Sequence, residues 1–217
     1  MEILLGLSAL LFAYLIGSVN FAVIFSKIFI KKDIREVGSG NAGMTNVMRA
    51  AGALPGILTF LCDALKGFVA CFVGKMIFQY LHTTTGNALF LGVYGAYICG
   101  VICMLGHIYP VFFGFKGGKG VAISVGIFAI CCPWAIVCGL ALFAVLLPTT
   151  KIMSISSLSA TIVVVATSFV FYDKTALFLP QVICATIMGL VVFLKHKDNI
   201  VRLIQGNENK FTIKKGK

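Results

Sequence analysis

Glycines, hydroxyl groups and one arginine follow each other between residues 38 and 49 in an order that suits phosphate binding. Gly38, Gly40 and Gly43 permit backbone angles that other residues avoid, and they allow a ligand to approach the main chain closely. Exposed N–H groups ahead of a helix N-terminus form an anion site, and Arg49 can add a bidentate contact. A simple turn with a capping side chain explains the same residues equally well.

A second glycine cluster, Gly114–Gly120, surrounds two lysines in the order Lys-Gly-Gly-Lys-Gly. It resembles phosphate-binding loops, but it does not match the ATP-binding P-loop because no Ser or Thr follows the lysine. Four glycines in seven residues exceed what a turn requires, so we expect Lys119 to contact phosphate. His107 precedes this cluster and either hydrogen-bonds a loop carbonyl or has a catalytic role.

Charged and polar groups also occur inside or beside apolar segments. Asp63 and Lys66 are three residues apart on one helical face, where they form either an ion pair or part of a functional site. Ser157 is one of four closely spaced serines (Ser154, Ser156, Ser157 and Ser159), which can simply bond to the backbone or pack helices. His196 and Asn199 precede a basic tail, and by themselves they indicate a surface anchor.

The composition places these residues in an integral membrane protein. Apolar residues make up 59% of the 217 residues and charged residues 12%, too few to cover a water-exposed globule. The net charge of +11 comes from basic residues between apolar runs, where they mark cytoplasmic loops and contact anionic lipid, so we expect no nucleic-acid partner. The eight cysteines lie in apolar stretches without metal-ligand spacing, so we expect no metal site.

Hydropathy predicts six apolar segments of spanning length. They are Ile3–Phe25, Leu54–Tyr80, Ala88–Leu105, Val121–Leu147, Ile152–Tyr172 and Ala176–Leu194. Six crossings would leave the basic tail Lys195–Lys217 outside, against the positive-inside rule. A break at Cys131-Cys132-Pro133-Trp134, with the first half starting near Gly117, gives a seventh crossing, although each half is short for a span. We therefore predict about seven transmembrane helices, with five or six as alternatives, in a single domain over residues 1–217.

The seven-helix topology brings the polar stretches to one side of the membrane. These stretches are Gly38–Gly52, Gly106–Gly120, a turn at Thr149–Ser159, and Lys195–Lys210. The predicted fold is thus an all-α integral membrane protein with glycine-rich loops clustered at the cytoplasmic face. The N-terminus is expected outside and the C-terminus in the cytoplasm.

Three motifs in this order resemble one known family. They are Gly38-Ser-Gly-Asn-x-Gly-x-Thr-Asn-x-x-Arg49, then Gly106-His-x-Tyr-Pro-Val-Phe-Phe-Gly-Phe-Lys-Gly-Gly-Lys-Gly-Val121, then His196-x-x-Asn-Ile-x-Arg-Leu203. Together with Asp63-x-x-Lys66-Gly67, they resemble the acyl-phosphate:glycerol-3-phosphate acyltransferases of bacterial inner membranes (PlsY-type). The resemblance covers essentially the whole chain, and the second motif is the most specific.

The resemblance implies an enzyme of phospholipid biosynthesis in the bacterial inner membrane. Such an enzyme transfers an acyl group from acyl phosphate to the 1-hydroxyl of glycerol 3-phosphate, giving lysophosphatidic acid. It implies seven transmembrane helices, the two substrates and membrane lipid as partners, and no cofactor; protein partners are unknown. The candidate catalytic residues are Ser39, Arg49, Lys119, His196 and Asn199. The candidate substrate-binding residues are Gly40, Asn41, Gly43, Thr45, Asn46, His107, Lys116, Gly117, Gly118 and Ser157.

Two questions stay open at the level of sequence. The general base is either His196 or a phosphate of the substrate itself. The alternative function is a small organophosphate or anion transporter that uses the same loops as a binding site. A transporter predicts polar groups at mid-membrane and an internal repeat, whereas the polar groups here cluster at one interface apart from Asp63 and Lys66.

Overall fold

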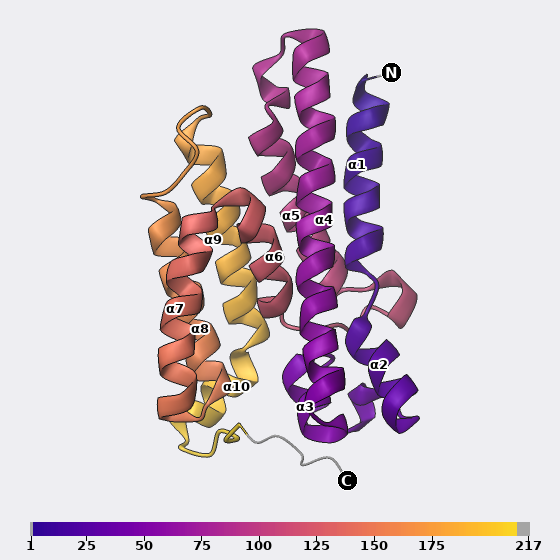
Figure 1. Cartoon of the computed structure of the whole chain (residues 1–217), viewed down its shortest axis with the longest axis vertical. Helices are drawn as coiled ribbons and strands as arrows, with labels where there is room; N and C mark the ends of the chain where they lie inside the picture. The colour runs from indigo at the N-terminus through magenta and orange to yellow at the C-terminus, as the bar shows by residue number, and fades with distance from the viewer. Residues whose placement is uncertain (1, 212–217) are drawn as a thin grey trace.

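The computed structural model describes residues 2–211, and it is all-helical over that range (Figure 1). Met1 and residues 212–217 lie outside the described residues. The predicted domain 1–217 and the predicted basic tail are therefore described only up to residue 211. The α-helices are α1 (Glu2–Gly17), α2 (Phe21–Ile30), α3 (Met44–Ala51), α4 (Ala53–Thr85), α5 (Gly92–Ile108), α6 (Val121–Cys131), α7 (Pro133–Thr150), α8 (Met153–Ser168), α9 (Phe178–Lys195) and α10 (Lys197–Ile204). Short 3₁₀ turns cover Ile34–Glu36, Ala88–Phe90 and Val111–Phe113.

Five helical stretches are long and apolar enough to cross a membrane. They are Glu2–Ile30, Ala53–Thr85, Gly92–Phe113, Pro133–Thr150 and Phe178–Lys195, and two shorter apolar helices are Val121–Cys131 and Met153–Ser168. The predicted break of Val121–Leu147 is confirmed, because α6 ends at Cys131 and α7 begins with Pro133. Proline is favoured at this first helical position because its missing N–H has no helical partner there. Seven crossings require both shorter helices to span, which stays a prediction.

Two expected elements are wrong in detail. The predicted helix Ile3–Phe25 is broken at residues 18–20, where the Asn20 side chain accepts a hydrogen bond from Val23 N (3.2 Å) and starts a new helix. The predicted turn Thr149–Ser159 is almost entirely helical and leaves only residues 151–152 outside α7 and α8. The Ser156 hydroxyl donates to the carbonyl of Ile152, one helical turn earlier. A helix can therefore accommodate these serines.

The helices form two groups with the longest helix, α4, in the first. α1, α5 and α6 pack against α4, while α7 packs on α8 and α8 on α9. α6 and α4 approach each other closely at Gly126, where any side chain would collide with the carbonyl of Ala64. The glycine therefore permits this contact. Figure 1 shows α3, α10 and the turn between α7 and α8 at the same end of the molecule, opposite the N-terminus. That end carries the candidate site.

Candidate active site

A cavity of about 780 Å³ lies between the two groups of helices. Its polar end is built from the segment before α3, the segment before α6, the start of α8 and the α9–α10 junction. Its apolar part is lined by Phe128, Ile136, Leu140, Phe143, Val164 and Met188, among others. One cavity therefore combines a cationic, hydrogen-bonding end with a hydrocarbon-like interior, which suits a molecule with a phosphate and an alkyl chain.

The first glycine loop is held in shape by the side chain of Asn46. This buried amide accepts from Ser39 N (3.1 Å) and donates to the carbonyls of Ile34, Val37 and Asn41 (3.1, 2.8 and 3.1 Å). Asn46 lines the cavity, yet its amide is occupied by the loop, so it acts on a ligand through the loop shape. Gly38 and Gly40 have positive φ angles of 59° and 70°, which favour glycine.

The second glycine loop lies directly on the end of α5. Gly117 N and Gly118 N donate to the carbonyls of Ile108 and His107 (3.1 and 3.2 Å). A side chain at Gly117 would collide with the His107 carbonyl, and one at Gly118 would collide with the His107 ring. The close approach therefore requires both glycines, and it fixes where the next residue, Lys119, leaves the loop.

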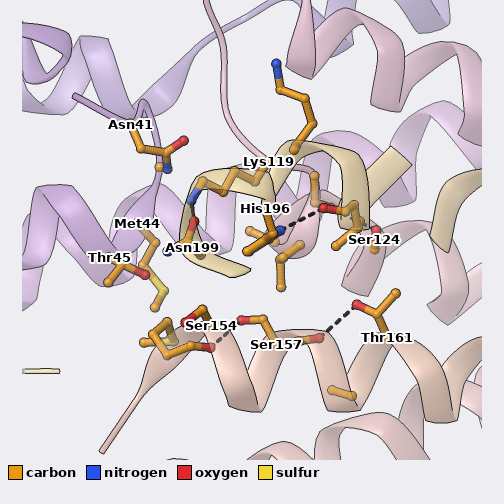
Figure 2. Close-up of a pocket in the computed structure, with 18 of the residues that line it drawn as sticks. Asn41, Met44, Thr45, Lys119, Ser124, Ser154, Ser157, Thr161, His196 and Asn199 are labelled. Atoms are coloured by element: carbon orange, nitrogen blue, oxygen red, sulfur yellow. Dashed lines mark hydrogen bonds between the residues drawn. The ribbon is translucent and has the colours of Figure 1, made fainter. Parts of the chain in front are cut away.

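Lys119 reaches across the cavity to the α9–α10 junction (Figure 2). Its Nζ donates to Asn199 Oδ1, and Asn199 Nδ2 donates to Glu208 Oε1 at 2.6 Å. Burial lowers the pKa of Lys119 to about 8, with the positive charge of Arg202 contributing and Glu208 opposing. The ammonium is thus partly desolvated, a state in which it interacts more strongly with a phosphate.

His196 is buried at the same junction (Figure 2). Its Nδ1 lies 2.8 Å from the carbonyl of Val192, so Nδ1 carries the proton and Nε2 is left as an acceptor. Burial lowers the pKa of His196 to about 4, although the bond to Val192 opposes this shift. The imidazole is therefore neutral at pH 7 and a weaker base than an ordinary histidine.

The segment Gly206–Phe211 folds back over the polar end of the cavity. Phe211 N donates to Lys151 O (2.6 Å), and Arg49 Nη2 donates to the carbonyls of Asn209 and Lys210 (3.3 and 3.1 Å). The Glu208 carboxylate anchors the segment, because it accepts from Ser154 Oγ (3.0 Å), Asn199 Nδ2 (2.6 Å) and Arg202 Nε (2.7 Å). Burial raises the pKa of Glu208, but these hydrogen bonds outweigh burial and hold the pKa below its usual value.

Replacing Glu208 by glutamine is expected to lower both stability and activity. Three donors would then face a neutral amide, and loss of charge-assisted hydrogen bonds costs about 1.5–3 kcal/mol each at most. We expect a fall in the melting temperature of the detergent-solubilised protein, measured by intrinsic fluorescence, together with a roughly tenfold loss of kcat/KM. Glu36→Gln, at an exposed carboxylate outside the cavity, is the control, and an equal effect of the two changes would contradict this role of Glu208.

The structure brings most of the candidate residues to this cavity. Those that line it are Ser39, Gly40, Asn41, Gly43, Thr45, Asn46, Arg49, His107, Gly117, Lys119, Ser157, His196 and Asn199. Gly118 does not line the cavity but lies against the Nε2 side of the His107 ring, and the exposed Lys116 lines a separate pocket of about 710 Å³ with Lys27, Asp33 and Arg35. The Ser157 hydroxyl donates to Met153 O at 2.8 Å, so it is shared with its own helix.

The sequence reading did not single out Glu208 and Arg202 as site residues. Glu208 lies in a tail that reads only as basic, and an acidic residue within that tail was the available signal. Asp63 also lines the cavity, and the ion pair considered for it exists, with Lys66 Nζ 2.7 Å from Asp63 Oδ1.

The apolar part of the cavity runs along α7 and α8. Ser157, Thr161 and Val164 follow each other on one face of α8, so they extend about 10 Å from the polar end. The hydroxyl of Thr161 donates to Ser157 O (2.8 Å; Figure 2). Its hydrogen-bonding donor is therefore satisfied within α8 and does not require a polar partner in the groove. The groove is therefore suited to an extended alkyl chain.

Comparison with known proteins gives the same family over nearly the whole chain. The sequence model of the family described as glycerol-3-phosphate acyltransferase matches residues 7–206. The chain is 38% identical over 206 residues to glycerol-3-phosphate acyltransferase 2 of Bacillus anthracis, covering 95% of this chain and 99% of that protein. It is 40% identical over 210 residues to glycerol-3-phosphate acyltransferase of Francisella philomiragia subsp. philomiragia, covering 95% and 93%.

Solved structures agree with the sequence comparisons. The crystal structure of PlsY, an integral membrane glycerol 3-phosphate acyltransferase, in its glycerol 3-phosphate form superposes with a TM-score of 0.81. It is 33% identical to this chain, and the match covers 95% of this chain and 96% of that one. A second PlsY structure, in the lysophosphatidic acid form, gives a TM-score of 0.79 at 32% identity. The chain therefore belongs to the PlsY-type family of glycerol-3-phosphate acyltransferases, and it is a multi-pass membrane enzyme.

Proposed function

We propose that this protein transfers an acyl group from acyl phosphate to the 1-hydroxyl of glycerol 3-phosphate, giving lysophosphatidic acid and inorganic phosphate. The observation that carries this proposal is the single cavity that joins Lys119 and Arg49 to an apolar groove. Both substrates bear a phosphate, which the polar end of the cavity would bind. The acyl phosphate also bears an alkyl chain, which the apolar groove would hold. The relatives are named for glycerol 3-phosphate, and the acyl-phosphate donor is the part that the proposal adds.

The reaction needs positioning more than activation. The hydroxyl oxygen attacks the acyl carbon, the bond from that carbon to the phosphate oxygen breaks, and the hydroxyl proton ends on the departing phosphate. Acyl phosphate is already a reactive mixed anhydride, so we propose no cofactor. Lys119 and Arg49 bind the phosphates, while Ser39 and Asn199 provide hydrogen bonds near the reacting carbon.

The proton acceptor in this proposal is a phosphate of the substrates. A pKa of about 4 makes His196 a poor base at neutral pH, since a good general base has a pKa near the working pH. His196→Gln is therefore expected to keep kcat within about tenfold of wild type and to act mainly on KM for glycerol 3-phosphate. Loss of kcat by about a thousandfold in both His196→Gln and His196→Ala, with unchanged KM, would instead make His196 the base.

We propose that the polar end of the cavity faces the cytoplasm of a bacterial inner membrane. The basic residues around that end agree with the positive-inside rule, which also places the N-terminus outside. Cysteine labelling of intact cells tests this orientation. Labelling of Lys210→Cys by an impermeant reagent from outside would contradict it.

Product formation by the purified, detergent-solubilised protein tests the function. Labelled glycerol 3-phosphate is supplied with palmitoyl phosphate, palmitoyl-CoA or palmitoyl carrier protein in parallel. We expect lysophosphatidic acid from palmitoyl phosphate alone. Product only from a thioester would overturn the proposed donor, and uptake of glycerol 3-phosphate into proteoliposomes without any product would favour the transporter.

A further inference from the structure

Three ionisable side chains form a buried cluster beside the cavity, inside the membrane-spanning helices. Lys66 of α4 lies 2.7 Å from Asp63 Oδ1 one turn earlier. Its Nζ also donates to Val19 O at 2.6 Å and lies 3.0 Å from Nδ1 of His107 on α5. All three side chains are at most 4% exposed. Charged groups at such depth are costly and require a compensating role.

The geometry determines where the histidine proton lies. An ammonium group has three N–H donors and no acceptor, and here its three neighbours are a carboxylate, a carbonyl and the His107 ring. Nδ1 of His107 also lies 3.6 Å from Asp63 Oδ1, which is too far for a hydrogen bond, whereas Lys66 Nζ is at 3.0 Å. Nδ1 therefore accepts from the ammonium and carries no proton. A neutral imidazole then has its single proton on Nε2. Asp63 and Lys66 form an ion pair, so with a neutral His107 the cluster has no net charge.

The Nε2 side of the His107 ring lies next to the second glycine loop. His107 lines the cavity, and its Nε2 lies against Gly118, the residue directly before Lys119. Among residues 2–211 no hydrogen-bond partner is found for Nε2, although Nδ1 is fully engaged. The ring therefore presents an unused donor next to the lysine that is proposed to bind phosphate.

We propose that Lys66 is a positioning residue that fixes the tautomer of His107, so that His107 Nε2–H donates to a phosphate oxygen of the bound substrate beside Lys119. Asp63 acts through its 2.7 Å ion pair with Lys66, since its Oδ1 is 3.6 Å from His107 Nδ1. The identity of the bound phosphate rests on the proposed function, but the tautomer does not. An ion pair that only stabilised the helices would not need His107 in one tautomer, and this difference makes the proposal testable.

The first test reads the tautomer directly, without activity. Protein labelled with ¹⁵N-histidine in detergent gives imidazole signals from three histidines, and His82→Asn and His196→Asn variants assign His107 by elimination. At pH 7 we expect Nδ1 of His107 to give the signal of an unprotonated imidazole nitrogen and Nε2 that of a protonated one. A protonated Nδ1 in the wild-type protein would overturn the proposal, and this measurement needs no change in the cluster itself.

The second test separates the two ring nitrogens by substitution. The amide of His107→Gln occupies about the position of Nε2 and can donate there, whereas the amide of His107→Asn occupies about that of Nδ1. We expect His107→Asn to raise KM for glycerol 3-phosphate at least tenfold above that of His107→Gln, with product still formed from acyl phosphate. His107→Asn performing as well as or better than His107→Gln would overturn the proposal.

The third test addresses Lys66. Lys66→Met alone leaves Asp63 unpaired in the interior, so the variant compared is Asp63→Asn/Lys66→Met, which removes both charges. In this folded double variant we expect the His107 nitrogens to give the averaged signals of mixed tautomers, and a KM rise similar to that of His107→Asn. His82→Asn, at the far end of α4, is the control and leaves KM unchanged. An unaltered His107 signal in the double variant would show that Lys66 does not set the tautomer. Absence of product from the wild-type protein would refute the proposed function alone.

Discussion

Replacing Lys119 by alanine is expected to lower kcat/KM by about a thousandfold, with little change in the melting temperature. The side chain provides a partly desolvated positive charge in the polar end of the cavity, and removing one such preorganised group typically costs 10²–10³ in rate. Stability should be largely retained, because burial of the ammonium is itself unfavourable, as its lowered pKa shows. Steady-state kinetics with acyl phosphate and glycerol 3-phosphate measure the effect.

Lys116 is the matched control for this change. It lies three residues earlier in the same loop, but it is exposed and lines the neighbouring pocket instead of the cavity. Lys116→Ala should change kcat/KM by less than about threefold, since single exposed charges contribute little. Similar losses in the two variants would mean that the loop responds to charge in general, and would contradict a specific role of Lys119.

The pH dependence of kcat/KM provides a second test of the role of the Lys119 charge. Because the pKa of Lys119 is about 8, the side chain loses its charge as the pH rises through that value, so kcat/KM of the free enzyme should fall on the alkaline side. Lys119→Arg keeps its charge at every accessible pH, so its remaining activity should show no such fall near pH 8. The same alkaline fall in both proteins would assign the titration to another group.

Replacing Arg49 by alanine is expected to lower kcat/KM by about a hundredfold, mostly through KM for glycerol 3-phosphate. Arg49 lines the cavity and holds the carbonyls of Asn209 and Lys210 through one nitrogen, Nη2, which leaves the rest of the guanidinium for a phosphate. Arg49→Lys should recover little, because an ammonium cannot contact the phosphate and the C-terminal segment in the same planar arrangement.

Arg35→Lys is the matched control for Arg49→Lys. Arg35 pairs with Asp33 (2.8 Å) and donates to Phe113 O (2.6 Å) in the neighbouring pocket, so its guanidinium is occupied outside the cavity. We expect activity close to wild type in this variant. Full activity of Arg49→Lys, or an equal loss in both variants, would contradict phosphate recognition by Arg49.

The general architecture could be predicted from hydropathy and charge. Helices long enough to span leave a strong signal in the sequence. The positive-inside argument placed a break within Cys131-Cys132-Pro133-Trp134, and the structure contains it between Cys131 and Pro133. The break after Gly17 was missed because the non-helical segment, residues 18–20, is only three residues long and lies within an apolar run. Nothing in hydropathy records that Asn20 starts a new helix there.

The site was predictable where a residue type has few structural uses, and less so elsewhere. Glycine-rich loops with Lys119 and Arg49 indicated phosphate, and these residues line one cavity. Asn46 was expected to bind substrate, whereas its four hydrogen bonds to loop backbone depend on a fold that spacing alone does not give. Glu208 belongs to the site through contacts with Ser154, more than fifty residues away, and such pairing is invisible in a single sequence.

The central claim is that phosphate and acyl chain meet in the cavity between the two groups of helices. A structure of the protein with glycerol 3-phosphate and a non-reactive acyl phosphonate tests it most directly. We predict phosphate oxygens within hydrogen-bonding distance of Lys119 Nζ and the Arg49 guanidinium, with the alkyl chain along α7 and α8. Phosphate bound instead in the neighbouring pocket at Lys116 and Arg35, or an acyl chain outside the groove, would contradict the account.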